Sequence, residues 1–165
     1  MVITNAVDNL KYHDLIDVKS AKEKHIRFRL EWGELWRTAE EQNLLVNPVL
    51  KTVFVDEMPK DAFMLQTNAS AMPEYSNLNP SNQQYYAIEK TVFYGLEKSN
   101  VLINPNDYEG HYALEVWKYD PLTLVGDLSN DMSVVDPLSL YLSLKDSQHE
   151  RIEMALEQII DKYIW

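Results

Sequence analysis

Glu115 is the carboxylate whose surroundings most suggest chemistry. It lies in an apolar segment beside Ala113 and Trp117, where an acid needs a hydrogen-bond partner or a raised pKa. Asp107 precedes it and Lys118 follows it, and two carboxylates with a lysine form the set that metal-dependent nucleases use around a scissile phosphate. Glu115 is therefore a candidate ligand or catalytic group.

The spacing of this set departs from the nuclease pattern. Glu115 and Lys118 are three residues apart, so on a strand they point to opposite faces, whereas the nuclease pattern puts acid and lysine on one face. An enzyme of this kind would hold Mg²⁺ or Mn²⁺ with Asp107, Glu115 and Asp120. A metal-dependent nuclease or phosphotransfer enzyme is therefore the alternative function, and a hydrogen-bonded structural acid is the simpler explanation.

Other chemical signatures are missing from the sequence. The four histidines are scattered without H-x-H or H-x-x-x-H spacing, and there is no cysteine, so neither a zinc site nor a cysteine nucleophile is predicted. Phosphate-loop, dinucleotide and hydrolase-elbow glycine motifs are also missing. We predict no catalytic residue, no metal site and no cofactor.

A basic hairpin is the best candidate for a binding surface. Residues 24–30 alternate, with His25, Arg27 and Arg29 on one face and apolar residues on the other, after a charged turn at 20–23. Basic side chains on such a hairpin contact the phosphate backbone in DNA-binding proteins, although any half-buried strand alternates in this way. The candidate DNA-binding residues are Lys11, Lys22, Lys24, His25, Arg27 and Arg29.

Charged residues are unevenly distributed along the chain. The net charge is −11, yet residues 1–30 carry six basic against four acidic residues, whereas residues 31–165 carry nine against 22. An acidic body repels nucleic acid and suits solubility or a basic protein partner, while the first thirty residues remain able to meet phosphate.

Aromatic residues supply a second candidate surface. Ten tyrosines and four tryptophans are present, and they are able to line a pocket or a partner surface, with core packing as the alternative. The candidates for a partner or pocket surface are Tyr75, Tyr85, Tyr86, Glu115 and Trp117.

The elements that position these residues follow from hydrophobic spacing. A helix is expected around residues 3–10, a short strand at 16–18, and an amphipathic helix from Trp32 that ends before Asn47-Pro48. Further along, we expect strands at 49–55, 85–88 and 112–119, a helical stretch near 60–66 and a loop-rich stretch over 67–84.

Two helices are predicted to close the chain. Asp136 as N-cap with Pro137 at the first position begins one helix. Ser147 and Glu150 have capping-box spacing ahead of the other, which carries apolar residues at helical intervals up to Tyr163.

Five blocks resemble known regulators. The stretch NAVDNLKYHDLIDVKSAKEKHIRFRL resembles the end of a recognition helix and the wing of MarR-like winged-helix regulators. The later blocks are similar to the C-terminal region of bacterial transcriptional regulators related to abortive-infection type IV antitoxins; they are ELWRTAEEQNLLVNPVLKTVFVDE, AMPEYSNLNPSNQQYYAIEK, ALEVWKYDP and VVDPLSLYLSLKDSQHERIEMALEQIIDKYIW. Those proteins combine an N-terminal winged helix with an effector or toxin-binding domain.

The match to a winged helix is partial. The complete module has two further helices before the recognition helix, yet only a dozen residues precede Leu15. Either the chain belongs to a longer protein, or it has lost DNA binding and keeps the hairpin for packing. We expect an α+β protein, with a winged-helix remnant at 1–30 and, at 31–165, a mixed α/β effector or partner-binding domain with a small sheet and two C-terminal helices.

The expected function is that of a non-enzymatic regulator. The resemblance implies the effector-binding or partner-binding part of a winged-helix transcriptional regulator or antitoxin. Its partners would be DNA, bound through the hairpin if the winged helix is complete, a basic protein such as a toxin, or a second copy of this chain in a homodimer. A ligand sensor or scaffold is a third interpretation, resting on aromatic content. No apolar run approaches 18 residues and no signal peptide is evident, so no membrane contact and a cytoplasmic location are expected.

Overall fold

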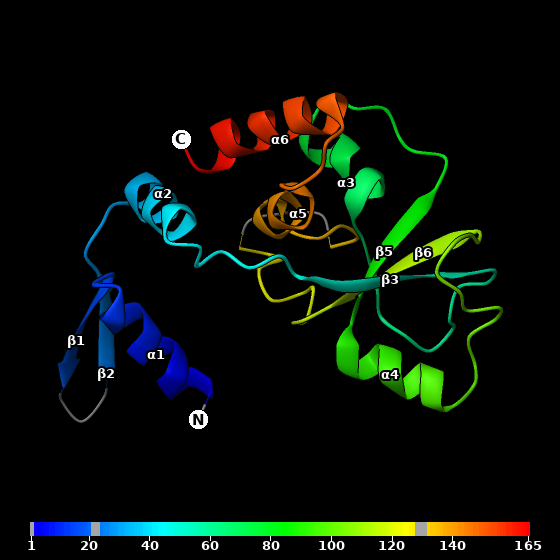
Figure 1. The fold of residues 1–165 in the computed structure, drawn as a ribbon, viewed down its shortest axis with the longest axis horizontal. Helices are drawn as coiled ribbons and strands as arrows, with labels where there is room; N and C mark the ends of the chain where they lie inside the picture. The colour runs from blue at the N-terminus through cyan, green and yellow to red at the C-terminus, as the bar shows by residue number, and fades with distance from the viewer. Residues whose placement is uncertain (1, 21–23, 128–131) are drawn as a thin grey trace. The chain divides into compact units, whose positions relative to one another are not determined.

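The computed structural model describes residues 2–20, 24–127 and 132–165. Within these ranges the chain has six helices and two small sheets, which confirms the predicted α+β class. It divides into two compact units, of which the first ends at Leu45 and the second begins at Val46 (Figure 1). Each unit is described by itself.

The first unit is a helix, a hairpin and a second helix. Its elements are α1 (Val2–Tyr12), β1 (Ile16–Ser20), β2 (Lys24–Phe28) and α2 (Trp32–Glu41). These agree with the expected order of elements. The boundary drawn from the sequence after residue 30 falls inside this unit, because α2 shares an apolar pocket with α1 and the hairpin.

Strand register gives the hairpin two different faces. Ile16 pairs with Phe28 and Val18 with Ile26, which collects apolar side chains on one face. The polar face pairs Asp17 with Arg27 and Lys19 with His25. The predicted alternation is confirmed, but Asp17 gives the face both signs of charge. The face is therefore mixed rather than purely basic.

The second unit is a four-stranded sheet with helices on both faces. Its strands are β3 (Val49–Val55), β4 (Leu65–Gln66), β5 (Gln84–Glu89) and β6 (Tyr112–Trp117), in the order β3-β6-β5-β4. Of the three pairs between these strands, β5–β6 is parallel, and β3–β6 and β4–β5 are antiparallel. The helices are α3 (Asn68–Tyr75), α4 (Lys90–Lys98), α5 (Pro137–Leu144) and α6 (Glu150–Tyr163).

Each face of this sheet has its own core. Figure 1 shows α4 on one face and α3, α5 and α6 on the other. Leu114, Val116 and Phe93 pack on the α4 side, while Trp117 and Met72 pack with the other three helices. Because β6 is inside the sheet and covered on both faces, its buried run of side chains is the one predicted for a central strand.

Two predictions in the middle of the chain are wrong. Residues 60–66 are not helical: Leu65 and Gln66 form β4, because pairing with β5 satisfies their backbone at the sheet edge. In the stretch 67–84, for which the sequence predicts mainly loop, residues 68–75 form α3. This helix tolerates Pro73 because Ala71, Met72 and Tyr75 are buried in the core.

The two C-terminal helices are present, and their caps differ from each other. The Asp136 carboxylate accepts a hydrogen bond from the N–H of Ser139 at 2.8 Å, so the predicted cap of α5 is confirmed. The capping box at Ser147 is wrong. The Ser147 Oγ accepts a hydrogen bond from the His149 N–H at 3.4 Å. The helix α6 begins at Glu150, and the His149 carbonyl accepts the N–H groups of Ile152 and Glu153 in its first turn.

The longest helix in the described ranges is α6, with 14 residues. None of the described helices has both the length and the apolar character needed to cross a membrane.

Candidate functional site

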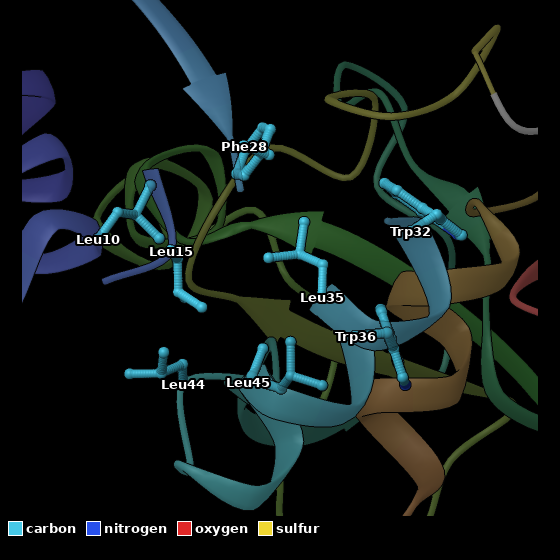
Figure 2. Close-up of a pocket in the computed structure, with 9 residues that line it drawn as sticks. Leu10, Leu15, Phe28, Trp32, Leu35, Trp36, Leu44 and Leu45 are labelled. Carbon is cyan, nitrogen blue, oxygen red and sulfur yellow. The ribbon is translucent and has the colours of Figure 1, made fainter. Parts of the chain in front are cut away.

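An apolar pocket of about 220 Å³ lies within the first unit (Figure 2). Side chains from α1, the start and end of the hairpin, α2 and the segment after α2 surround it. The lining residues are Leu10, Leu15, Phe28, Trp32, Leu35, Trp36, Ala39, Leu44 and Leu45. None of these nine side chains is charged, so the pocket suits an uncharged apolar group.

Helical spacing supplies one wall of this pocket. Trp32, Leu35, Trp36 and Ala39 follow one another at intervals of three and four residues, so they share one face of α2. Phe28 and Trp32 are each about half exposed, at 51% and 52% of their surface. The wall therefore continues outward as accessible aromatic surface.

The helices α1 and α2 end in the same way, and both endings place residues in the lining of the pocket. Asp14 after α1 and Asn43 after α2 both adopt the left-handed conformation, with φ of 57° and 55°. The next residue then bonds backward across the last turn: the Leu15 N–H donates to the Leu10 carbonyl at 3.0 Å, and Leu44 to Ala39 at 2.8 Å. These four residues all line the pocket.

This pocket was missed in the sequence. The spacing of the α2 stripe is visible there, but it predicts only an amphipathic helix. Glycine usually marks this kind of helix ending. The chain has only four glycines and has Asp14 and Asn43 at these two positions, so the usual signal is missing. An Asp-Leu or Asn-Leu pair after a helical stripe is the signal that points to it.

Arg29 is held by two carboxylates on the polar side of the hairpin. Its Nε donates to Asp17 Oδ1 at 2.9 Å, and its two terminal nitrogens lie 2.8 Å from Asp17 and 3.1 Å from Asp14. Hydrogen bonding to Asp17 and the charge of Asp17 raise the pKa of Arg29. This side chain therefore braces the base of the hairpin, and its charge is largely compensated.

The other predicted DNA-binding residues lie in different settings. His25 and Arg27 are exposed on β2, and Lys11 is exposed in the last turn of α1. Lys22 lies outside the described residues, as does the side chain of Lys24. Lys19, which is not among the candidates named from the sequence, pairs with His25 across the hairpin and is exposed.

Glu115 is the centre of a buried polar network. It is 3% exposed and accepts three hydrogen bonds: from Asn68 Nδ2 at 2.7 Å, Thr67 Oγ1 at 3.2 Å and Trp117 Nε1 at 3.3 Å. Asn68 reaches it from the first residue of α3, with φ of 50°. The carboxylate thus joins β6 to the start of α3.

Burial governs the ionisation of this network. Desolvation raises the pKa of Glu115, and the three donors oppose the rise without cancelling it. Burial and the charge of Glu115 also raise the pKa of Tyr85. A raised pKa is found both in structural carboxylates and in catalytic ones. The groups around Glu115 therefore have to distinguish the two roles.

The carboxylates of the enzyme alternative have separate surroundings. Asp107 is exposed in the loop before β6, while Asp120 accepts the Leu122 N–H at 3.0 Å in a turn after it. Lys118 donates to the Asn47 carbonyl at 2.7 Å. In the described part of the chain, no three His, Asp or Glu residues are grouped closely enough to hold a metal ion.

The predicted aromatic surface is divided by the sheet. Tyr75 is buried, with its hydroxyl 2.7 Å from the Val135 carbonyl, and it packs with Trp117 on the face covered by α3, α5 and α6. Tyr86 packs on the α4 face near Tyr112. Tyr86 is therefore separated from the other four residues, because neighbouring positions on a strand point to opposite faces. Glu115 accepts a hydrogen bond from Trp117, and its charge acts on Tyr85, so Tyr75, Tyr85, Glu115 and Trp117 share the face covered by α3, α5 and α6.

No protein-family model, curated protein or solved structure matches this chain. The resemblance to winged-helix regulators therefore stays a prediction.

Proposed function

We propose that this chain is a non-enzymatic regulatory protein, the partner-binding part of a winged-helix regulator or antitoxin, whose hairpin contacts a nucleic-acid backbone. The observation that carries the proposal is the strand register. It sets Lys19, His25 and Arg27 side by side on one exposed face, immediately after a helix. A helix followed by a hairpin with exposed cations is the arrangement that lets a wing lie along phosphates.

The brace at the base of the hairpin supports this role. Arg29 joins Asp17 on β1 to the end of β2, and so holds the two strands in register. Its charge is compensated, which leaves Lys19 and Arg27 as the cations directed outward from the described polar face. The hairpin therefore has separate residues for rigidity and for contact.

Charge distribution also favours this unit as the contact point. Residues 1–45 carry seven basic and eight acidic residues, a net charge of −1, whereas residues 46–165 carry eight and 18, a net charge of −10. A polyanion is repelled least by the first unit.

Salt-dependent binding tests the proposal. Anisotropy of a labelled DNA duplex is measured against salt for the wild type and for the double variant Lys19→Ala/Arg27→Ala. Each lost phosphate contact makes the negative slope of log K against log salt shallower by about 0.9, so we expect the slope of this double variant to be shallower by about 1.8. The double variant Lys90→Ala/Lys98→Ala makes the same charge change on α4 and should keep the wild-type slope. Equal slopes in both double variants, or no binding by the wild type, would reject the proposal.

A basic protein partner is a second candidate function. Glu153, Glu157 and Asp161 are spaced by four residues along α6 and line a groove of about 540 Å³ beside Leu156 and Ile160. Lys145 also lines the groove, so its three carboxylates outnumber one cation. This excess of negative charge beside apolar side chains suits the cationic, amphipathic surface of another protein.

A basic amphipathic peptide tests this candidate. The double variant Glu153→Gln/Glu157→Gln should weaken binding of the peptide and reduce its salt dependence. The charge-matched double variant Glu57→Gln/Glu109→Gln, at exposed positions elsewhere, should not. Equal losses in both double variants would mean that net charge alone attracts the peptide.

A further inference from the structure

We infer that the pocket of residues 1–45 binds a small, uncharged aromatic molecule. Binding stands on the pocket itself, and only its regulatory consequence rests on the proposed function. The pocket has a volume of about 220 Å³, is partly open to solvent, and has walls from α1, the hairpin and α2.

Volume sets the size of the ligand. An apolar cavity of about 150 Å³ lined by leucine, isoleucine and phenylalanine stays dry and binds benzene. The present pocket is larger and has the same kind of lining. A single substituted ring or a pair of fused rings therefore fits it.

The lining sets the chemistry of the ligand. Five leucines and one alanine provide apolar contacts, and Phe28, Trp32 and Trp36 provide ring faces and edges for offset or edge-to-face packing. A carboxylate or an ammonium group would lose its hydration without meeting an opposite charge among these nine side chains. The ligand is therefore uncharged.

The small core of this unit gives the pocket its affinity for an apolar guest. Among the described residues of 1–45, the buried apolar side chains are Leu15, Ile16 and Ala39. Units of this size are marginal when their core is small. A guest in the pocket adds apolar contacts to three elements together, so binding stabilises the fold of the unit.

The walls of the pocket suggest how binding reaches the hairpin. Leu10 belongs to α1, Leu15 precedes β1 and Phe28 ends β2. A ligand that touches these three side chains fixes the hairpin against α1. If the hairpin contacts a nucleic acid, such a ligand therefore acts as an effector of that contact.

Toluene and benzoate provide a matched pair of probes, because both have one ring and they differ in charge. Each is titrated into the full-length protein, labelled with ¹⁵N, and the shifts of backbone amide signals are recorded. We expect toluene to move the signals of pocket residues and to raise the melting temperature, and benzoate to do neither. No toluene response, a response elsewhere in the chain, or an equal response to benzoate would overturn the inference.

A filled pocket is the control. Leu35→Trp adds a ring within the lining, whereas Leu50→Trp makes the same change at an exposed position of β3. Leu35→Trp should weaken toluene binding about tenfold or more, equivalent to about 1.4 kcal/mol, and Leu50→Trp should leave it unchanged. The milder Ala39→Val replaces Leu35→Trp if that variant does not fold. Equal toluene affinity in the filled and control variants also overturns the inference.

DNA anisotropy with and without toluene separates this inference from the proposed function. Toluene binding without any DNA binding keeps the pocket and rejects the nucleic-acid role. DNA binding without toluene binding does the reverse. A change in DNA affinity with toluene, lost in Leu35→Trp, supports the effector role.

Discussion

The two units differ in how completely they bury their large apolar side chains. In the second unit both faces of a four-stranded sheet are covered by helices, and large side chains such as Phe93 and Trp117 are fully buried. In the first unit, aromatic side chains of similar size, Phe28 and Trp32, are half exposed at a pocket. The same residue types thus form a closed core in one unit and an accessible surface in the other.

This difference shows where each unit obtains its order. Apolar burial on two sides stabilises the second unit, which carries most of the negative charge. The first unit depends on local devices: the left-handed helix ends at Asp14 and Asn43, and the brace between Arg29, Asp14 and Asp17. Such a unit is suited to respond to a ligand, because its core gains from one.

Replacing one phenylalanine in each unit tests the comparison most strongly. Phe93→Ala empties a fully buried site and should cost about 3–5 kcal/mol of unfolding free energy. Phe28→Ala removes a half-exposed ring and should cost about 1 kcal/mol. Urea denaturation of both variants measures the difference. Similar costs would show that the first unit has a core as closed as the second.

Removing the buried carboxylate is the next largest change. Glu115→Ala leaves the donors of Asn68, Thr67 and Trp117 without an acceptor, which should cost about 3 kcal/mol. Glu109→Ala, at an exposed position, should cost far less. If thermal denaturation finds the two variants alike, Glu115 does not hold β6 to α3.

The same carboxylate predicts a dependence on pH. Its folded pKa lies above the ordinary value of 4.5, so the folded state keeps a proton that the unfolded state has released. The contribution to stability is therefore fully present below pH 4.5 and is lost as pH rises through the folded pKa. Urea titrations from pH 4.5 upward should show a flatter profile for Glu115→Gln than for the charge-matched Glu109→Gln. Parallel profiles would contradict the assignment.

The hairpin brace should give the smallest and most local effect. Arg29→Ala removes both ion pairs, which are exposed, so overall unfolding should change little. Faster hydrogen exchange is expected at the β1 and β2 amides, with the sheet of the second unit unchanged. Arg27→Ala, on the same face, is the control and should leave exchange as in the wild type. Faster exchange throughout the chain would mean that the brace is not local.

Hydrophobic periodicity and helix-capping residues are enough to predict several elements from the sequence. Alternation at 24–30 predicts the hairpin and its faces, the stripe from Trp32 predicts α2, and Asp136-Pro137 predicts the start of α5, because each depends on neighbours within a few residues. The same signals failed where distant partners decide. Residues 65–66 become a strand only because β5 lies beside them, and α3 persists around Pro73 because the core holds it.

The site residues divide in the same way. The sequence identified Glu115 as a carboxylate among apolar residues, since its neighbours on the strand are visible in order. Only the tertiary structure supplied Asn68 and Thr67 as its donors, from 47 and 48 positions away. Likewise, the sequence places Arg29 among the candidate DNA-binding residues, and only the tertiary structure shows its ion pairs with Asp14 and Asp17. The pocket required two helix ends to meet, and that meeting depends on packing in three dimensions rather than on any local period.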